Sequence, residues 1–178
     1  MAFEKEMEEL RRRKQRALEM GGAEKVARQH ARGKLTARER IEQLLDRGSF
    51  LEVGMLNFSD MPGMEEKTPA DSKICGFGRI EGRQVMVIAN DFTVLASTSS
   101  RVAGRKEREM KEVSARRGIP LVYLGEAGGA RMPDIMGSRG LASFGGGEFD
   151  SFLRGLTRVR QAPLVTAVMG ECYGKPTW

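Results

Sequence analysis

The sequence predicts an α/β protein, and two patterns carry this prediction. In the second half of the chain, helical segments alternate with short apolar runs, which is the pattern of strand–helix–strand units. One apolar run, residues 83–89, shows no alternation of apolar and polar side chains, as expected for a strand that helices cover on both faces. We therefore expect a parallel sheet with helices packed against it.

Helical segments come first along the chain. Residues 3–20 carry a sparse apolar stripe at helical spacing, and Gly21-Gly22 follows as a stop signal. A second helix is predicted to begin after Thr36, because Thr36 and Glu39 have the spacing of a capping box, in which the two side chains satisfy reciprocal backbone N–H groups. The polar run 29–34 is expected to link these two helices.

Strand signals follow the helices. Residues 54–72 lack periodicity and predict a loop. Two runs rich in strand-forming residues, 74–80 and 83–89, flank Glu81-Gly82, which predicts a β-hairpin. The remaining elements are expected, in order, as a helix near 100–116, a strand at 121–124, a helix near 148–160 and a strand at 164–169.

The chain is expected to divide into an N-terminal helical arm, residues 1–48, and a sheet domain, residues 49–178. Residues 175–178 come one loop after a buried strand, with no closing helix. Since a parallel sheet needs both faces covered, we expect the chain to be part of a larger fold.

The composition argues against several classes of protein. The 178 residues carry a net charge of +6, but the basic residues of the arm are interleaved with Glu, as on a solvated helix rather than a nucleic-acid surface. We also expect no membrane span and no secretory signal, because no long apolar stretch occurs. The two cysteines, Cys75 and Cys172, fit no metal spacing, so reduced, buried thiols in a cytoplasmic protein are expected.

The single histidine, His30, lies in a polar run and is expected to be a solvated side chain. Hydrolases with Ser/His/Asp or Cys/His triads need an imidazole beside a nucleophile, and no Gly-x-Ser-x-Gly elbow occurs to meet His30. A histidine-rich zinc site is excluded for the same reason, and we expect no metal in this chain.

Small residues gather where three predicted strands end, at residues 96–100, 128–130 and 170–174. Ligands of open α/β sheets bind outside the carboxyl ends of the strands, where free backbone N–H groups suit a phosphate or a developing oxyanion. No P-loop sequence occurs, and Gly76-Phe-Gly78 lacks the third glycine of a dinucleotide fingerprint. These residues alone leave Gly128-Gly129 open between a tight turn and an anion site.

Six short motifs stand in a specific order from residue 25 onward: Ala31-Arg-Gly-Lys-Leu-Thr-Ala-Arg-Glu-Arg-Ile41, Leu45-Asp-Arg-Gly-Ser-Phe50, Gly76-Phe-Gly-Arg-Ile80, Ala89-Asn-Asp-Phe-Thr-Val94, Gly128-Gly-Ala-Arg131 and Met169-Gly-x-Cys172. Together they resemble the carboxyltransferase β subunits of biotin-dependent acyl-CoA carboxylases, such as the propionyl-CoA carboxylase β subunits and the methylmalonyl-CoA carboxyltransferases. The resemblance covers the N-terminal half of that family.

This resemblance implies a crotonase-type fold of stacked ββα units, also known from ClpP, preceded by a helical arm. It implies that this half binds the acyl-CoA, while a C-terminal half supplies most of the biotin pocket. The implied partners are that C-terminal half, a biotin carboxyl carrier protein or biotin carboxylase subunit that delivers carboxybiotin, and further copies of the chain, since hexamers are usual for the family. Nucleic acid and membrane are not among them.

The implied reaction moves a carboxyl group between carboxybiotin and the α-carbon of a short-chain acyl-CoA of the acetyl, propionyl or methylmalonyl class. It passes through an enolate, whose oxygen preorganised N–H donors stabilise. The resemblance assigns the donors to Gly128, Gly129 and Ala130, and the facing wall of the acyl-CoA site to Ala96, Ser97, Thr98 and Ser99. The phosphates of coenzyme A are assigned to the basic motif of the arm, at Arg32, Lys34 and Arg38. Arg131 is expected to anchor the glycine loop.

The chain departs from the family's common motifs at Leu95-Ala-Ser-Thr98, at Glu126-Ala127 and at Cys172-Tyr-Gly-Lys-Pro176. These departures indicate a divergent branch, whose acyl group cannot be inherited from the best-known members.

Three rival functions stay open. One is another crotonase-type acyl-CoA enzyme, such as a decarboxylase, hydrolase or isomerase, with Glu126, Asp134 or Glu148 as its acid or base. Another is a non-catalytic CoA-binding or assembly module that lacks the second half. Nucleic-acid binding by the basic arm comes last.

Overall fold

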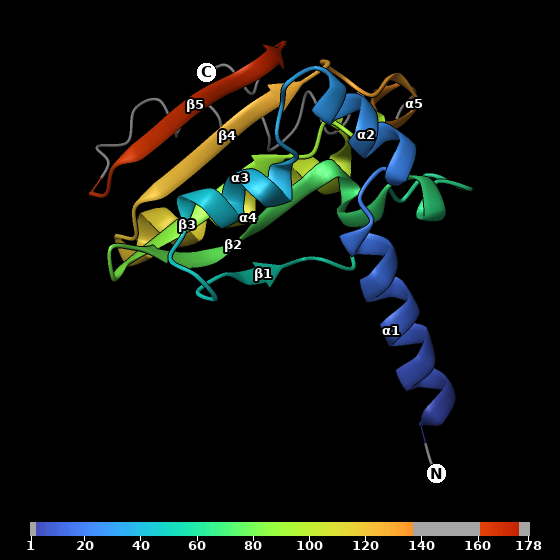
Figure 1. Ribbon diagram of the computed structural model, residues 1–178, viewed down its shortest axis with the longest axis horizontal. Coiled ribbons are helices and arrows are strands. Elements are labelled where there is room, and N and C mark those ends of the chain that lie inside the picture. Colours follow the sequence, from blue (N-terminus) through green and yellow to red (C-terminus); the bar gives the residue numbers. More distant parts are fainter. Residues whose placement is uncertain (1–2, 137–160, 175–178) are drawn as a thin grey trace.

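The computed structural model describes residues 3–136 and 161–174. Its centre is a five-stranded sheet whose strands lie side by side in chain order (Figure 1). Strands β1, β2 and β3 pair antiparallel, whereas β3, β4 and β5 pair parallel. The strands are β1 (Leu51–Val53), β2 (Lys73–Ile80), β3 (Arg83–Asn90), β4 (Leu121–Ala127) and β5 (Leu164–Cys172). The predicted α/β class is therefore confirmed, with a sheet that is mixed rather than wholly parallel.

The predicted hairpin is formed by β2 and β3. Ile80 pairs with Arg83, so Glu81 and Gly82 alone make the turn, with φ angles of 50° and 75°. Two successive left-handed residues are typical of the type I′ turn, whose twist matches that of the flanking strands. The prediction from the local sequence is confirmed in position and in turn length.

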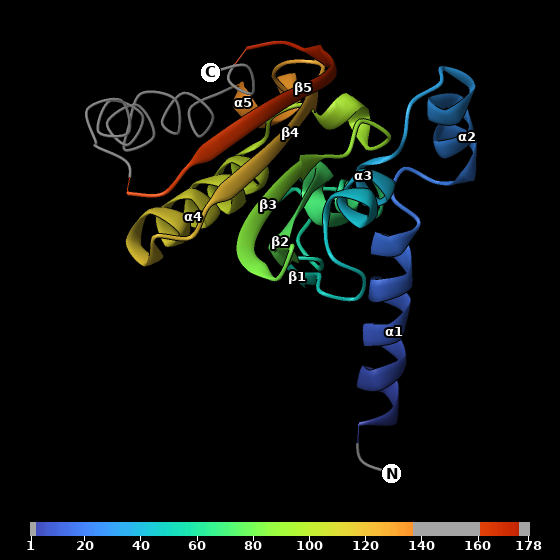
Figure 2. The ribbon, with the colours of Figure 1, turned by 60° about the vertical axis from the view of Figure 1, so that its left-hand side comes forward.

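Helices cover both faces of the sheet. Helix α3 (Ala37–Leu44) lies against one face and the long helix α4 (Arg101–Arg117) against the other (Figure 2). The side chains of β3 alternate between the two cores: Val85, Val87 and Ala89 join the cluster with α3, while Met86 and Ile88 join the cluster with α4. This double burial explains the unbroken apolar run of β3.

The N-terminal arm holds three helices instead of the two expected. Helix α1 (Glu4–Leu18) projects away from the sheet, and α3 begins at the predicted capping box of Thr36 and Glu39 (Figure 1). Between them lies α2 (Ala23–Ala31), where the sequence predicted a linker from residue 29. The polar segment is helical because Val26 packs on the core and Gln29 is buried, which no local pattern reveals.

The arm and the sheet share one core. Met20, Ile41 and Leu45 pack with Val87 and Leu124 of the strands. The boundary expected at residue 48 is thus no break in packing, and it stays a prediction.

Three of the elements expected after β3 are described, and they occur in the expected order: α4, β4 and β5. Ser100 caps the N-terminus of α4 by accepting a hydrogen bond from the Ala103 N–H, and Gly118 ends the helix. Strands β4 and β5 are longer than predicted, and a short helix α5 (Met132–Ile135) follows β4. The helix expected near 148–160 and the terminal residues 175–178 lie outside the described residues. Two short 3-10 turns, Glu65–Lys67 and Pro69–Ser72, interrupt the predicted loop.

Both cysteines are free thiols, and their surroundings differ. Cys75 is fully buried, as predicted, whereas Cys172 is only half-buried, because it lies on the outermost strand of the described sheet. Within residues 3–136 and 161–174, no helix is both long and apolar enough to cross a membrane.

Candidate active site

Two loops meet at the carboxyl ends of β3 and β4. The Gly128 N–H donates to the Ala96 carbonyl oxygen at 2.8 Å, and the Ser99 N–H donates to the Gly129 oxygen at 2.8 Å. Ser99 and Ala130 form an isolated parallel bridge, which continues the sheet for one more pair. The structure thus brings the 96–99 segment alongside the glycine loop, the two segments that the sequence assigned to one site.

The three predicted N–H donors differ in availability. The Gly128 N–H is occupied by Ala96, whereas no described residue accepts a hydrogen bond from the N–H of Gly129 or Ala130. Gly129 is half-buried and has a φ of 101°, a conformation that side chains rarely adopt, while Ala130 is exposed. Two adjacent, unused donors therefore lie at this strand end.

Unusual backbone angles surround these donors. Ala70, Asp71 and Ser72 have φ angles of 52°, 42° and 60°, and Leu95, Ala96 and Ser97 have 47°, 52° and 47°. Left-handed angles at six non-glycine residues cost free energy, of order 1–3 kcal/mol each in the least favourable cases. The two left-handed turns, 70–72 and 95–97, are joined by a hydrogen bond, since the Ser97 hydroxyl donates to the Ser72 carbonyl oxygen at 3.0 Å.

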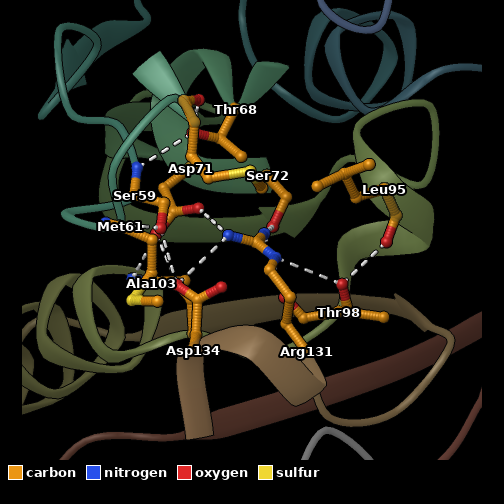
Figure 3. Close-up of polar contacts among 12 residues, drawn as sticks. Ser59, Met61, Thr68, Asp71, Ser72, Leu95, Thr98, Ala103, Arg131 and Asp134 are labelled. Atoms are coloured by element: carbon orange, nitrogen blue, oxygen red, sulfur yellow. Dashed lines mark hydrogen bonds and ion pairs between the residues drawn. The ribbon is translucent and has the colours of Figure 1, made fainter. Parts of the chain in front are cut away.

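Arg131, directly after Ala130, is an anchor and not a surface residue. Its guanidinium is buried and lies 2.6 Å from Asp71 Oδ1, with Thr98 O at 3.2 Å on its other side (Figure 3). It also reaches Ser72 Oγ at 3.4 Å. The side chain therefore connects both left-handed turns to the glycine loop, as the sequence led us to expect of Arg131.

The basic residues of the arm turn inward more than the sequence predicted. Lys34 Nζ lies 2.8 Å from Glu126 Oε1, and the Arg38 guanidinium pairs with Glu52 at 2.7 Å and with the Ala17 carbonyl oxygen at 3.1 Å. Arg32 is exposed and has no ion pair with any residue of the described ranges. Lys34 and Arg38 thus hold the arm to the sheet, and Arg32 is the assigned phosphate ligand whose charge is uncompensated.

Glu126 is the centre of a buried cluster that the sequence did not reveal. Its carboxylate is fully buried at the end of β4 and contacts Lys34, Arg40 at 2.6 Å and Gln29 at 3.1 Å. Gly170 of β5 leaves the space for this cluster, because a Cβ there would lie 2.4 Å from both Glu126 Oε1 and Lys34 Nζ. An acidic residue at the end of an apolar strand was the available signal.

A second buried network lies on the α4 face of the sheet. Lys73 Nζ contacts Asn90 Oδ1 at 2.9 Å, the Tyr123 hydroxyl at 3.0 Å and Glu107 at 3.2 Å. Burial alone would lower the pKa of Lys73, but the neighbouring Tyr123 and Glu107 outweigh it and raise that pKa. The ammonium group is therefore a charged, structural member of the core.

Lys106 ties this face to the first left-handed turn. Its Nζ donates to the backbone oxygens of Gly54 at 2.9 Å, Ala70 at 3.3 Å and Lys73. Burial lowers the pKa of Lys106. By donating to these three carbonyl oxygens, the Lys106 ammonium group holds the strained turn at Ala70 in place.

The acids that a rival chemistry would need are constrained. Glu126 is saturated by the arm, and Asp134 is buried with Oδ1 accepting from the Ser59 hydroxyl at 2.6 Å. Asp134 Oδ2 is buried without a hydrogen-bond partner. Glu148 lies outside the described residues.

The single histidine, His30, is exposed as predicted and contacts Glu39 at 2.9 Å. Over the described ranges, no group of three His, Cys, Asp or Glu side chains could hold a metal ion.

Comparison with known proteins identifies the family. Residues 28–176 match the carboxyl transferase domain. The chain is 36% identical over 177 residues to the propionyl-CoA carboxylase carboxyltransferase subunit of Haloferax mediterranei, covering 98% of this chain and 33% of that protein. It is 38% identical over 173 residues to the mitochondrial propionyl-CoA carboxylase β chain of Homo sapiens, covering 94% and 31%. The chain thus spans about a third of the length of these relatives.

A solved structure agrees with this match. The transcarboxylase 12S hexamer, solved with methylmalonyl-CoA and methylmalonic acid bound, superposes with a TM-score of 0.82 at 31% identity, over 99% of this chain and 34% of its own. The expected crotonase-like α/β fold is therefore confirmed. From the matching domain and the relatives together, we conclude that this chain belongs to the family of carboxyl transferase domains, whose members similar to it are carboxyltransferase enzymes.

Proposed function

We propose that this chain forms the acyl-CoA half of a biotin-dependent carboxyltransferase. In this proposal the thioester oxygen of a short-chain acyl-CoA accepts hydrogen bonds from the N–H groups of Gly129 and Ala130. As the α-carbon gains or loses a carboxyl group, negative charge develops on that oxygen as an enolate. The two preorganised donors stabilise this charge more than the neutral thioester, by about 3 kcal/mol per donor.

The single observation that carries the proposal is the pair of unused N–H groups at the end of β4. The N–H groups of the neighbours on both sides, Gly128 and Arg131, donate to Ala96 and Ser99, whereas those of half-buried Gly129 and exposed Ala130 stay available to a ligand. The donor pair also lies at the carboxyl ends of parallel strands, which is where ligands of α/β sheets bind. Gly128, whose N–H bonds to Ala96, then positions the loop instead of contacting the substrate.

The rest of the acyl-CoA would contact the 96–99 segment and the N-terminal arm. Ala96, Ser97, Thr98 and Ser99 would form the wall opposite the donors, with Thr98 half-buried and tied to Arg131. Arg32 would meet a phosphate of coenzyme A. Lys34 and Arg38 would contribute mainly by holding the arm in place, since both are ion-paired.

When bound, carboxybiotin supplies the carboxyl group that is transferred. No residue of the described ranges is assigned to biotin. Delivery of biotin would fall to a carrier protein or carboxylase subunit, and its pocket to a C-terminal half, so that further copies of the chain and a second half complete the active site. The base for the α-proton that the acyl-CoA loses on forming the enolate would also be supplied by biotin, so proton transfer needs no side chain of this half.

Isothermal titration calorimetry tests the proposal. Acetyl-CoA, propionyl-CoA and methylmalonyl-CoA are titrated into the folded chain, with free coenzyme A as the reference. The proposal expects at least one thioester to bind more tightly than coenzyme A. Equal affinities for coenzyme A and all three thioesters would overturn the oxyanion-hole assignment, and no binding of any of them would overturn the CoA-binding assignment.

A further inference from the structure

The carboxylate of Asp71, in the first left-handed turn, joins the glycine loop to the N-terminus of helix α4. It is fully buried, and Arg131 Nη1 lies 2.6 Å from its Oδ1. Its Oδ2 accepts hydrogen bonds from the Ser100 hydroxyl and, at 3.1 Å, from the Ala103 N–H in the first turn of α4. Figure 3 shows Asp71 and Arg131 facing each other between the two turns.

Asp71 itself has an unfavourable backbone conformation. Its φ and ψ are 42° and 50°, between two further left-handed residues, Ala70 and Ser72. Such angles persist only where contacts with the surrounding structure hold them in place, and they cluster at functional sites. Here the surroundings are identifiable: Lys106 binds the Ala70 oxygen, and the Ser72 oxygen accepts from the Asp91 N–H at 2.9 Å.

Asp71 is connected to the N–H donors of the glycine loop through the side chain of Arg131. Arg131 follows Ala130 directly, and its own N–H donates to the Ser99 oxygen at 2.8 Å. Its guanidinium is held by Asp71 on one side and Thr98 on the other. The Gly129 carbonyl oxygen is held by the Ser99 N–H at 2.8 Å, and both the backbone and the side chain of Arg131 are fixed. The peptide groups of Gly129 and Ala130 therefore have little freedom to rotate, although their N–H groups donate to no described residue.

We propose that Asp71 is a positioning residue of the oxyanion hole: through Arg131 it fixes the direction in which the N–H groups of Gly129 and Ala130 point. This inference rests on the function proposed above. A carboxylate that only stabilised the fold would not affect which ligands bind, whereas a positioning residue sets how well the donors meet a thioester oxygen.

The experiment measures the preference for a thioester by calorimetry on the whole chain. This preference is the Kd of coenzyme A divided by the Kd of whichever of acetyl-CoA, propionyl-CoA and methylmalonyl-CoA the wild type binds most tightly. Asp71→Asn removes the charge but keeps the shape of the side chain. Met110→Ala is the matched control, because it opens a cavity under α4 and lowers stability without touching the Asp71–Arg131 contacts. Urea unfolding ranks the two variants by stability.

We expect Asp71→Asn to lose the preference by about tenfold while its Kd for coenzyme A stays unchanged, and Met110→Ala to keep the preference. If Asp71→Asn does not fold, Arg131→Lys decides, since lysine keeps the charge but cannot hold Asp71 and Thr98 together. It should lose the preference at least threefold.

Three outcomes overturn the inference. Either the decisive variant keeps the wild-type preference, or Met110→Ala loses it to the same extent, or the wild type has none. Only the last outcome also removes the proposed function, so the two failures are distinguishable.

Discussion

Glu126 and Arg40 form a salt bridge of 2.6 Å between the end of β4 and helix α3, and both side chains are buried. Together with Lys34, this pair fixes the arm two residues before the glycine loop begins. The cluster holds two cations and one anion, so loss of the carboxylate leaves two buried or half-buried positive charges facing each other.

Glu126→Gln should therefore destabilise the protein strongly, by roughly 3–5 kcal/mol, because breaking a buried pair leaves uncompensated charge. Urea unfolding followed by circular dichroism measures this loss. Glu109→Gln is the control, since Glu109 pairs with Arg105 on the exposed face of α4 and should cost about 0.5 kcal/mol or less. Equal losses for the two variants would contradict the role given to Glu126.

Two substitutions at Gly129 test its N–H group. Gly129→Ala strains a residue whose φ is 101° but keeps the N–H. Gly129→Pro removes the N–H and cannot adopt that φ, because the ring fixes φ near about −65°. A Cβ has room, since its nearest neighbour is Tyr173 Cβ at 3.9 Å. Gly129→Ala should bind propionyl-CoA more tightly than coenzyme A, and Gly129→Pro should not. The ratio of the two Kd values is the readout, and a folded proline variant with an intact preference would argue against the donor role.

The two thiols should react at different rates. Burial raises the pKa of Cys75 to about 11, so at pH 8 only about one molecule in a thousand carries the thiolate. Burial also raises the pKa of Cys172, which is half-buried and more accessible. Mass spectrometry after iodoacetamide treatment should find Cys172 modified in the native protein and Cys75 only after denaturation. Native-state labelling of Cys75 at the rate of Cys172 would contradict this packing.

The capping box predicts that the protein loses stability over a defined range of acidic pH, as Glu39 becomes protonated. Hydrogen bonds from His30 and from the Thr36 backbone lower the pKa of Glu39 from 4.5 to about 2. A carboxyl group with a lower pKa in the folded state stabilises the protein above its unfolded pKa, and this stability is lost as the pH falls from 4.5 towards 2. Glu39→Gln should therefore flatten the dependence of the urea midpoint on pH in that window. A Glu39→Gln variant that keeps the wild-type slope would contradict this role of the capping box.

The sequence predicted the parts of the fold that depend on neighbouring residues. The capping box at Thr36 and the two-residue turn at Glu81-Gly82 each arise from contacts a few residues apart. Helix α2 was missed because its stability comes from packing of Val26 and burial of Gln29 against distant strands. No local pattern encodes such tertiary contacts.

The candidate site divides in the same way. The proximity of the 96–99 segment and the glycine loop follows from parallel strands that end at one edge. The salt bridge of Lys34 with Glu126 joins residues 92 positions apart, and no spacing rule connects them. The left-handed angle of Asp71 was equally hidden, because no glycine marks it and only its tertiary contacts hold it.

Nuclear magnetic resonance tests the central claim most directly. Proton–nitrogen correlation spectra of the chain are recorded during titration with propionyl-CoA and, separately, with coenzyme A. If the thioester oxygen accepts hydrogen bonds from Gly129 and Ala130, their amide protons move downfield with propionyl-CoA but not with coenzyme A, while the Gly128 signal, already bonded to Ala96, moves little. Unchanged Gly129 and Ala130 signals at saturating propionyl-CoA would contradict the account.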